Sequence, residues 1–346
     1  MTMSKARATS QESAKIVPSK ADWNATQWRE TDEWIYRLYA DEVSELVAAL
    51  DHAKSAGLSG TDVRREDFPL PTLGPVLNDL ATELADGRGF FLMRGFPAQD
   101  FSKQDASTVF WGVGTYIGSP WPQNASGDVL GDVRDTGRSI LDPTVRGYQT
   151  KVRLPFHTDG SDLVGLMCLR TGKSGGSSSI VSSVACHNEL ARTAPDLLAR
   201  HYHPFFYDWR GEEKPGTNGW YDMPTFTLHH GRLFNRYIRG FIDSAQRFAE
   251  LPRHTELDKR ALDALDALTE DPRFRLDMDL QPGDMQFINN YVIFHSRTAY
   301  EDHEEEDKKR HMKRLWLSTD KFGDRPDTFT NRGYDQAWWS KKNAAS

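Results

Sequence analysis

The pattern of apolar positions predicts helices in the first third of the chain. Asp41 can cap a helix, because apolar side chains follow it at the spacing of one helix face. The same spacing recurs over residues 71–84, and a further helix is expected over about 103–116. Residues 89–95 form an apolar run closed by a glycine, which is typical of a buried strand. The N-terminal part is therefore predicted to be mostly helical.

Short apolar segments separated by glycine, serine and proline make up the rest of the chain. They predict strands over 163–169, 178–184, 203–208, 224–229, 232–236, 284–294 and 313–318. Two short helices are expected near 187–202, and a helical insert spans about 240–270. Many short strands, with helices in front of them and in one insert, predict a mainly β fold of the jelly-roll type.

No repeat, long linker or change of composition divides the chain. Residues 1–20 are polar and lack a hydrophobic period, so we expect them to be disordered. Residues 21–346 are predicted to form a single domain. It consists of a helical N-terminal part over about 21–88 and a β core over about 89–320, which contains the insert over about 240–270.

Charge and composition exclude several classes of function. The 346 residues include 43 Lys and Arg against 50 Asp and Glu, a formal net charge of −7, and such a chain repels phosphate backbones. No apolar run approaches the length of a membrane span, and residues 1–20 lack the apolar centre of a signal peptide. The two cysteines, Cys168 and Cys186, suit a reducing compartment. We therefore expect a cytoplasmic protein that acts on a small molecule and binds neither nucleic acid nor membrane; a homo-oligomer is left open.

Candidate chemistry lies in the histidines, because two His and one carboxylate on one face of an ion form a facial metal site. On extended backbone a His-x-Asp/Glu triplet directs both side chains the same way. Three such triplets, at 187–189, 254–256 and 303–305, fall at predicted helix starts or in a charged loop. The fourth, His157-Thr158-Asp159, follows an extended segment and precedes a strand. It is the best candidate pair, and a capping role at a strand end is the alternative.

His295 is the candidate third ligand, because it follows the apolar strand predicted over 284–294. There it would lie at the mouth of the jelly roll, or it would be an ordinary edge histidine. Arg310 and Arg314 flank the last predicted strand and share a face if that strand is regular. Buried guanidiniums need anions, and arginine holds a carboxylate in a bidentate fork. A solvated basic patch is the alternative, and the nearby histidine pattern favours the anion site.

Together these motifs resemble the taurine dioxygenase / 2,4-dichlorophenoxyacetate dioxygenase (TauD/TfdA-like) family of Fe(II)- and 2-oxoglutarate-dependent oxygenases. The resemblance covers about residues 89–318. It rests, in chain order, on FFLMRGFP, PFHTDG, the Gly-Gly-Ser-Ser turn at 175–178, GDMQFINNYVIFHSRTAYED and RHMKRLWLS. It implies a double-stranded β-helix, the cupin-like form of the jelly roll, with the active site at one mouth.

The resemblance also implies a role for each candidate residue. The ligands of Fe(II) would be His157, Asp159 and His295. Residues that face the cosubstrate would be Arg310, which holds the distal carboxylate of 2-oxoglutarate, Ser178, whose hydroxyl meets the same carboxylate, and Arg314. The acidic stretch 303–307 lengthens the spacing between His295 and Arg310 relative to taurine dioxygenase, so Arg314 is an alternative anchor.

The reaction implied by the resemblance consumes O2 and 2-oxoglutarate, releases succinate and CO2, and hydroxylates the substrate. Related halogenases lack the carboxylate ligand and leave its place to a halide. Asp159 therefore favours hydroxylation over halogenation, while desaturation and ring closure use the same ligands.

Polar residues near the expected site predict a small polar or anionic substrate, such as an amino-acid derivative, a sulfonate or an organic acid. The candidate contacts are Asn124, Gln149, Arg153 and Arg297, with Gln123 and Tyr148 beside them. A loop that bears Trp209, Trp220 and Tyr221 is expected to form a lid. Two other classes of function remain, a zinc hydrolase with the same three ligands and a jelly-roll binding protein without metal. The two arginines after the last ligand disfavour both.

Overall fold

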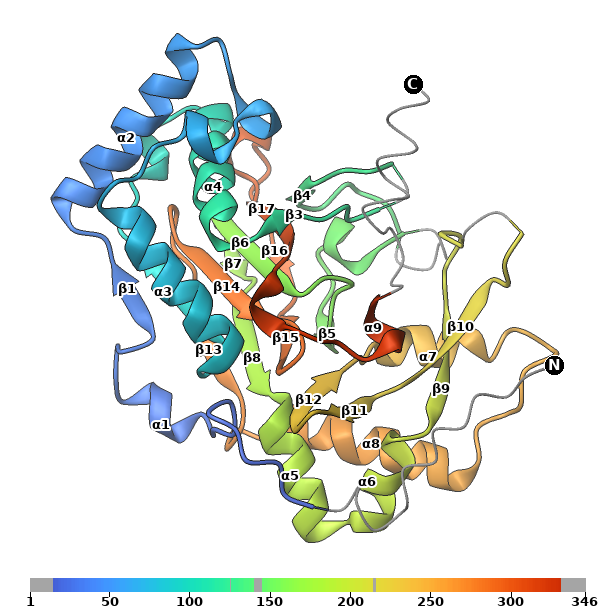
Figure 1. Ribbon diagram of the computed structural model, residues 1–346. Helices are drawn as coiled ribbons and strands as arrows, with labels where there is room; N and C mark the ends of the chain where they lie inside the picture. Colours follow the sequence, from blue (N-terminus) through green and yellow to red (C-terminus); the bar gives the residue numbers. More distant parts are fainter. Residues whose placement is uncertain (1–14, 125, 140–144, 214–215, 331–346) are drawn as a thin grey trace.

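The computed structural model describes residues 15–124, 126–139, 145–213 and 216–330, and Figure 1 shows strands flanked by helices. The helices are α1 (Thr26–Arg29), α2 (Ala40–Ser55), α3 (Leu73–Asp86), α4 (Lys103–Ile117), α5 (Ser183–Thr193), α6 (Pro195–His201), α7 (Arg239–Ala245), α8 (Glu256–Glu270) and α9 (Asp327–Thr330). The strands are β1 (Ile35–Arg37), β2 (Phe90–Arg94), β3 (Ser119–Pro120), β4 (Leu130–Val133), β5 (Leu154–His157), β6 (Leu163–Arg170), β7 (Ser174–Gly175), β8 (Ser178–Ser182), β9 (Pro204–Asp208), β10 (Trp220–Pro224), β11 (Phe226–His229), β12 (Arg232–Asn235), β13 (Leu276–Met278), β14 (Met285–Asn289), β15 (Ile293–Arg297), β16 (Tyr300–Glu301) and β17 (His311–Ser318).

Two sheets form the centre of the fold. The larger has the order β1-β2-β14-β6-β17-β3 with β4 also on β17, and the smaller has the order β13-β8-β15-β5. Phe90 and Val164 of the larger sheet share one buried cluster with Ile180 and Ile293 of the smaller sheet. The inner faces of the sheets therefore enclose a common core, which confirms the predicted double-stranded β-helix.

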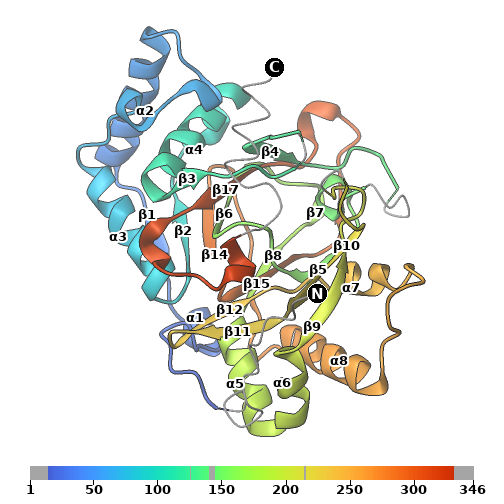
Figure 2. The ribbon, with the colours of Figure 1, turned by 45° about the vertical axis from the view of Figure 1, so that its right-hand side comes forward.

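Helices cover the outer face of the larger sheet and pack at one end of the smaller sheet. Phe91 and Phe287 of the larger sheet stack with their ring centroids 5.2 Å apart, and Phe110 of α4 lies 5.9 Å from Phe287. Helix α3 packs beside α4 on the same face (Figure 1). Helices α5, α6 and α8 pack together at one end of the smaller sheet (Figure 2). No described helix is long and apolar enough to span a membrane.

Two expected boundaries near the N-terminus need correction. Tyr39, and not Asp41, is the cap of α2, because its backbone N–H donates to the Glu42 carboxylate over 2.9 Å. Of the segment 1–20 that we expected to be disordered, residues 1–14 lie outside the described part of the chain. Val17 is buried and its backbone N–H donates to Asn188 Oδ1 over 2.8 Å, so chain packing begins before residue 21.

The segment 284–294 is not one strand. It contains β14 of the larger sheet and the start of β15 of the smaller sheet, joined by a turn at 290–292. His295 therefore lies inside β15 and not at a strand end. The helical insert expected over 240–270 consists of α7 and α8.

Candidate metal centre

The three predicted metal ligands converge at one end of the smaller sheet. Strands β5 and β15 are antiparallel neighbours, and their register places His157 opposite His295. The two imidazole centroids are 4.2 Å apart. Asp159 follows two residues after His157, and its carboxylate oxygens lie 3.8 Å from His157 Nε2 and 3.9 Å from His295 Nε2. All three side chains are buried, and their ligand atoms lie within 4.8 Å of one another.

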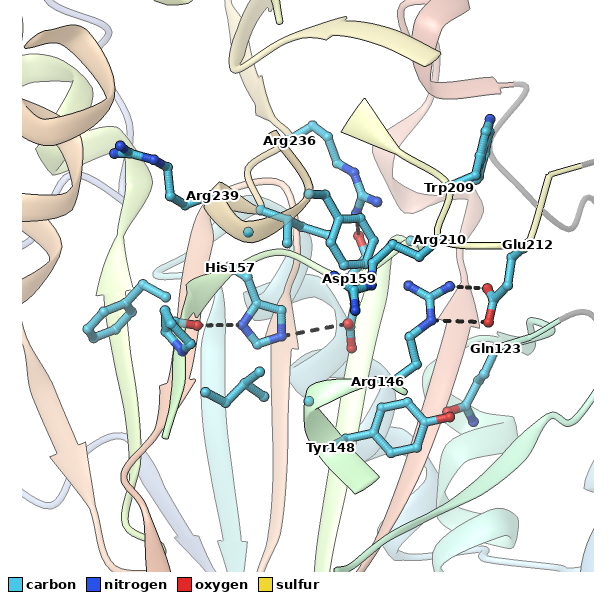
Figure 3. A pocket seen from close by; sticks show the side chains of 18 of the residues that line it. Gln123, Arg146, Tyr148, His157, Asp159, Trp209, Arg210, Glu212, Arg236 and Arg239 are labelled. Atoms are coloured by element: carbon cyan, nitrogen blue, oxygen red, sulfur yellow. Dashed lines mark hydrogen bonds and ion pairs between the residues drawn. The ribbon is translucent and has the colours of Figure 1, made fainter. Parts of the chain in front are cut away.

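A hydrogen bond orients His157, and burial keeps both histidines in the form that binds a metal. His157 Nδ1 lies 2.9 Å from the Pro155 carbonyl, so Nδ1 carries the proton and Nε2 is free to ligate (Figure 3). Burial lowers the pKa of His157, and burial together with His157 lowers the pKa of His295 to about 3. Both imidazoles are therefore neutral at neutral pH.

Asp159 is the negative member of the triad. Burial raises its pKa, but the Arg314 guanidinium and the two imidazoles outweigh burial and hold the pKa below its usual value. Asp159 Oδ2 accepts hydrogen bonds from Trp316 Nε1 over 2.9 Å and from Arg314 Nη1 over 3.3 Å. Two neutral imidazoles and one oriented carboxylate are the donor set of a facial Fe(II) site.

Two further side chains hold the backbone of this motif. Arg236 Nη1 donates to the carbonyls of Thr158 over 3.0 Å and of Asp159 over 2.6 Å, and Arg236 Nη2 donates to the Tyr221 hydroxyl over 3.0 Å. From the other side Asn290 Oδ1 accepts from the Asp159 N–H over 2.9 Å, and Asn290 Nδ2 donates to the Asp159 carbonyl over 2.6 Å. Arg236, which directly follows β12, and Asn290, in the turn before β15, thus hold the loop that carries His157 and Asp159 from two sides.

Sequence reasoning missed Arg236, Asn290 and Trp316. Trp316 carried a readable signal, because it stands two residues after Arg314 and shares its face of β17. Asn290 lies within the motif GDMQFINNYVIFHSRTAYED, but the sequence alone predicts no contact for it. Arg236 follows a hairpin and belongs to no motif, so its contact with the ligand loop appears only in the fold.

Arg310 is a buried cation that has no ion pair with any described carboxylate. Its Cζ lies 5.0 Å from the Tyr300 ring centroid, and its Nη2 is 3.5 Å from the Gly176 carbonyl. A side chain at Gly176 would meet this guanidinium, since its Cβ would lie 2.9 Å from Arg310 Nε. Within the described residues Arg310 Nη1 has no hydrogen-bond partner and the side chain has no ion pair. Burial lowers its pKa, so a carboxylate bound here would relieve a real energetic cost.

Arg297, a predicted substrate contact, has a structural role instead. Its guanidinium donates to the carbonyl of Thr150 over 3.0 Å and to that of Val152. It lies over the same Tyr300 ring at 4.7 Å, and burial together with Arg310 lowers its pKa to about 10. In the sheet Arg297 is paired with Ser178, the buried first residue of β8. Ser178 therefore lies directly across the sheet from Arg297, which shares the Tyr300 ring with Arg310.

A cavity of about 480 Å³ opens beside the triad (Figure 3). Its lining includes His157 and Asp159, and its aromatic walls are formed by Trp121, Tyr148, Phe156, Trp209, Tyr221, Phe241 and Trp316. Across the cavity Arg146 forms a two-contact ion pair with Glu212. The cavity is therefore apolar in its body and carries cations close to the triad.

The predicted lid residues divide between this cavity and the surface. Trp209 and Tyr221 line the cavity with their ring centroids 4.3 Å apart. Trp220 instead packs against Phe206 at 5.2 Å, and its indole N–H donates to Glu250 over 3.2 Å. Alternation along β10 explains the difference, because neighbouring residues of a strand face opposite sides.

The other predicted substrate residues are placed as follows. Gln123 and Tyr148 line the cavity, and both contact Arg314. Arg314 Nε donates to Gln123 Oε1 over 2.7 Å, and Arg314 Cζ lies 4.4 Å from the Tyr148 ring centroid. Arg153 lines the cavity but forms an ion pair with Glu270.

Asn124 and Gln149, two predicted substrate contacts, do not line the cavity. Asn124 Oδ1 accepts from the backbone N–H groups of Ser126 and Asp128 and so closes its own turn. Gln149 Oε1 accepts from the backbone N–H of Arg146 over 3.0 Å and caps a single 3₁₀ turn.

Comparisons with known proteins agree with this site. The sequence profile of the family described as taurine catabolism dioxygenase TauD, TfdA family matches residues 54–316. The chain is 34% identical to FR-33289 synthase of Streptomyces rubellomurinus over 312 residues, which is 88% of this chain and 91% of that protein. It is 28% identical to taurine hydroxylase-like protein SAT17 of Stachybotrys chartarum, over 85% of this chain and 77% of that protein. It is 31% identical to uridine-5'-phosphate dioxygenase of an Amycolatopsis species, over 50% of this chain and 64% of that protein.

Solved structures show the same fold. Asparagine oxygenase bound to Fe(II), hydroxyasparagine and succinate superposes with a TM-score of 0.65 at 16% identity, over 83% of this chain and 94% of that chain. The iron oxygenase OrfP bound to iron and α-ketoglutaric acid superposes with a TM-score of 0.61 at 15% identity. The match covers 82% of this chain and 94% of that chain. With the profile match over most of its length and the His-Asp-His triad in place, the chain belongs to the TauD/TfdA family of dioxygenases.

Proposed function

We propose that the protein is an Fe(II)- and 2-oxoglutarate-dependent dioxygenase that hydroxylates a small polar or anionic organic molecule. The observation that carries the proposal is the buried facial triad beside an aromatic cavity. A buried arginine, Arg310, which has no ion pair among the described residues, supports it.

The residues fit both groups. His157, Asp159 and His295 would hold Fe(II), because two neutral imidazoles and a carboxylate are its usual donors in such oxygenases. The ion, with 2-oxoglutarate and O2, supplies the oxidising chemistry: one oxygen atom enters the substrate C–H bond and the other enters succinate as CO2 leaves. Arg310 would hold the distal carboxylate of the cosubstrate, since its Nη1 has no other partner in the described chain. Ser178 would support the same carboxylate.

Arg314 is assigned a different role from Arg310. It keeps the Asp159 carboxylate charged and oriented and places its guanidinium on the cavity wall. The aromatic residues around it exclude water and position the substrate against the triad.

A partly anionic substrate is supported by the cations of the cavity. Arg236 and Arg314 both line it, and no carboxylate other than Asp159 is paired with Arg314 among the described residues. One relative is named for a phosphate-bearing substrate, uridine-5'-phosphate, and one fold neighbour for an amino acid. We infer the same range for this chain: an amino-acid derivative, a sulfonate, a phosphate ester or an organic acid. Two buried free thiols, Cys168 and Cys186, support a reducing, cytoplasmic location.

The test is O2 uptake coupled to succinate formation. The purified protein is incubated with Fe(II), 2-oxoglutarate and a panel drawn from those four substrate classes. We expect one member to raise O2 consumption and succinate above the background seen without substrate, and H157A to abolish both. Succinate formation that persists in H157A, or a protein that hydrolyses an ester with Zn²⁺ but consumes no O2, would overturn the proposal.

A further inference from the structure

A second cluster of metal-ligating side chains lies on the surface, at the hairpin between β11 and β12. His229 pairs with Arg232, which leaves His230 and Gly231 as the two turn residues. Both have left-handed backbone, with φ of 48° and 78°. These angles suit a type I′ turn, where Asn and Gly are preferred. Histidine is also among the residues that are enriched in left-handed backbone, so His230 fits the turn while glycine would fit it without any side-chain restriction.

A distant segment brings a carboxylate to this turn. Asp324 follows β17 and a 3₁₀ turn, and its Oδ2 lies 3.0 Å from His229 Nε2 and 3.3 Å from His230 Nε2. The two imidazole centroids are 4.2 Å apart. All three ligand atoms lie within 4.8 Å of one another. Both imidazoles thus turn the same nitrogen toward one carboxylate oxygen.

These separations match a coordination sphere. With bonds of roughly 2.0–2.2 Å to nitrogen and oxygen, two neighbouring ligands of a tetrahedral Zn²⁺ ion are about 3.3 Å apart. The distances from Asp324 to the two histidines have this size before any ion is bound. In the buried triad the Asp159 oxygens lie 3.8 and 3.9 Å from the histidine nitrogens, so those ligands would have to move closer together to reach the spacing of a tetrahedral site.

We propose that His229, His230 and Asp324 form a second metal site, which binds a divalent transition-metal ion such as Zn²⁺ independently of the iron centre. Two imidazoles and a carboxylate suit this class of ion, and water would complete the coordination. The His230 and Asp324 side chains are each 74% exposed, so the ion exchanges readily and binds more weakly than at the buried triad.

The ion would fasten the C-terminal segment to the hairpin. Beyond Asp324, Phe329 packs against Phe234 at 5.4 Å, and Thr328 lines the cavity beside the triad. His229 in turn lies 6.4 Å from Phe234. A metal bridge at Asp324 therefore holds a segment that forms part of the cavity wall.

The experiment measures Zn²⁺ binding with a chromophoric chelator as competitor. In the full chain carrying H157A/H295A, which removes two iron ligands, we expect one Zn²⁺ per chain and a rise in Tm on adding Zn²⁺. Adding H230G removes the ligand while glycine suits the left-handed turn, so this variant keeps its fold. It should bind no Zn²⁺, show no Zn²⁺-dependent rise, and be at least as stable as its parent without metal. H52A, at an exposed histidine of α2, is the matched control and should leave the bound Zn²⁺ unchanged.

The proposal is overturned if the H157A/H295A protein binds no Zn²⁺, or if H230G leaves its binding unchanged. Should H157A/H295A fold poorly, the same measurement on the otherwise native chain decides. Wild type should bind two Zn²⁺ ions and H230G or D324N one, and equal stoichiometry in all three would overturn the proposal.

Discussion

Arg314 donates to the Asp159 carboxylate over 3.3 Å, so one of the two arginines near the last strand is already engaged by a metal ligand. Arg310 has no such contact, although only four residues separate the two in sequence. The register of β17 against β6 shifts between His311 and Met312, which places an irregularity between them. Their guanidiniums therefore meet different aromatic rings, Tyr300 for Arg310 and Tyr148 for Arg314. This division predicts different kinetic effects.

R310A should raise the KM for 2-oxoglutarate by about tenfold or more, because a charge-assisted bidentate pair is worth roughly 1.5–3 kcal/mol. R310K should recover part of the loss by keeping the charge. Steady-state kinetics with varied 2-oxoglutarate measures both. An unchanged KM in R310A together with a raised one in R314A would assign the anchor to Arg314 instead.

In the H230G background, which lacks the proposed surface site, H157A should abolish Fe(II) binding and leave the fold intact, since the imidazole lies at the end of a strand and outside the large apolar clusters. Metal content after reconstitution and circular dichroism measure the two properties. H303A in the same background is the matched control, because His303 belongs to another His-x-Glu triplet that the fold leaves outside the triad. If H157A/H230G retains one Fe(II) per chain, the assignment of the triad is wrong.

The ligands could be predicted from sequence because local backbone geometry selects them. His157 and Asp159 are two residues apart where extended chain leaves a strand, and the other His-x-Glu triplets fall on helices or in a charged loop. His295 was expected at a strand end, but it lies inside β15, where it meets the other two predicted ligands. The register that sets it opposite His157 depends on the pairing of two strands far apart in sequence, and no local pattern encodes that pairing.

Two of the predicted substrate residues lie away from the cavity, for a physical reason. A polar side chain near a motif has many local partners, and Asn124 and Gln149 use backbone groups two to four residues away. Those local bonds were readable as turn signals in the sequence. The contacts of Arg236 with Thr158 and Asp159 cross 78 and 77 residues of chain, so only the folded structure shows them.

R236K should weaken metal binding about 10- to 100-fold, as is usual when a group that orients a ligand is lost. Lysine cannot reach the two carbonyls of the ligand loop and the Tyr221 hydroxyl together. Y221F removes only the last of these bonds and should have a smaller effect. Titration with Co²⁺ as a spectroscopic probe, carried out in the H230G background that lacks the proposed surface site, measures both affinities, alongside Tm. Equal Co²⁺ affinity in R236K and wild type would show that Arg236 does not position the ligands.

Asp159 predicts the outcome of the reaction. It fills the third protein position of the facial triad and is held there by Trp316 and Arg314, so no place is left for a halide. The substrate should therefore gain one hydroxyl whose oxygen comes from O2, with one succinate per turnover. Mass spectrometry under ¹⁸O2 measures this directly, and the product should carry one labelled atom. Desaturation and ring closure begin at the same ligands, and they would give an unlabelled product two mass units lighter than the substrate. A chlorinated product formed in the presence of chloride would contradict the role given to Asp159.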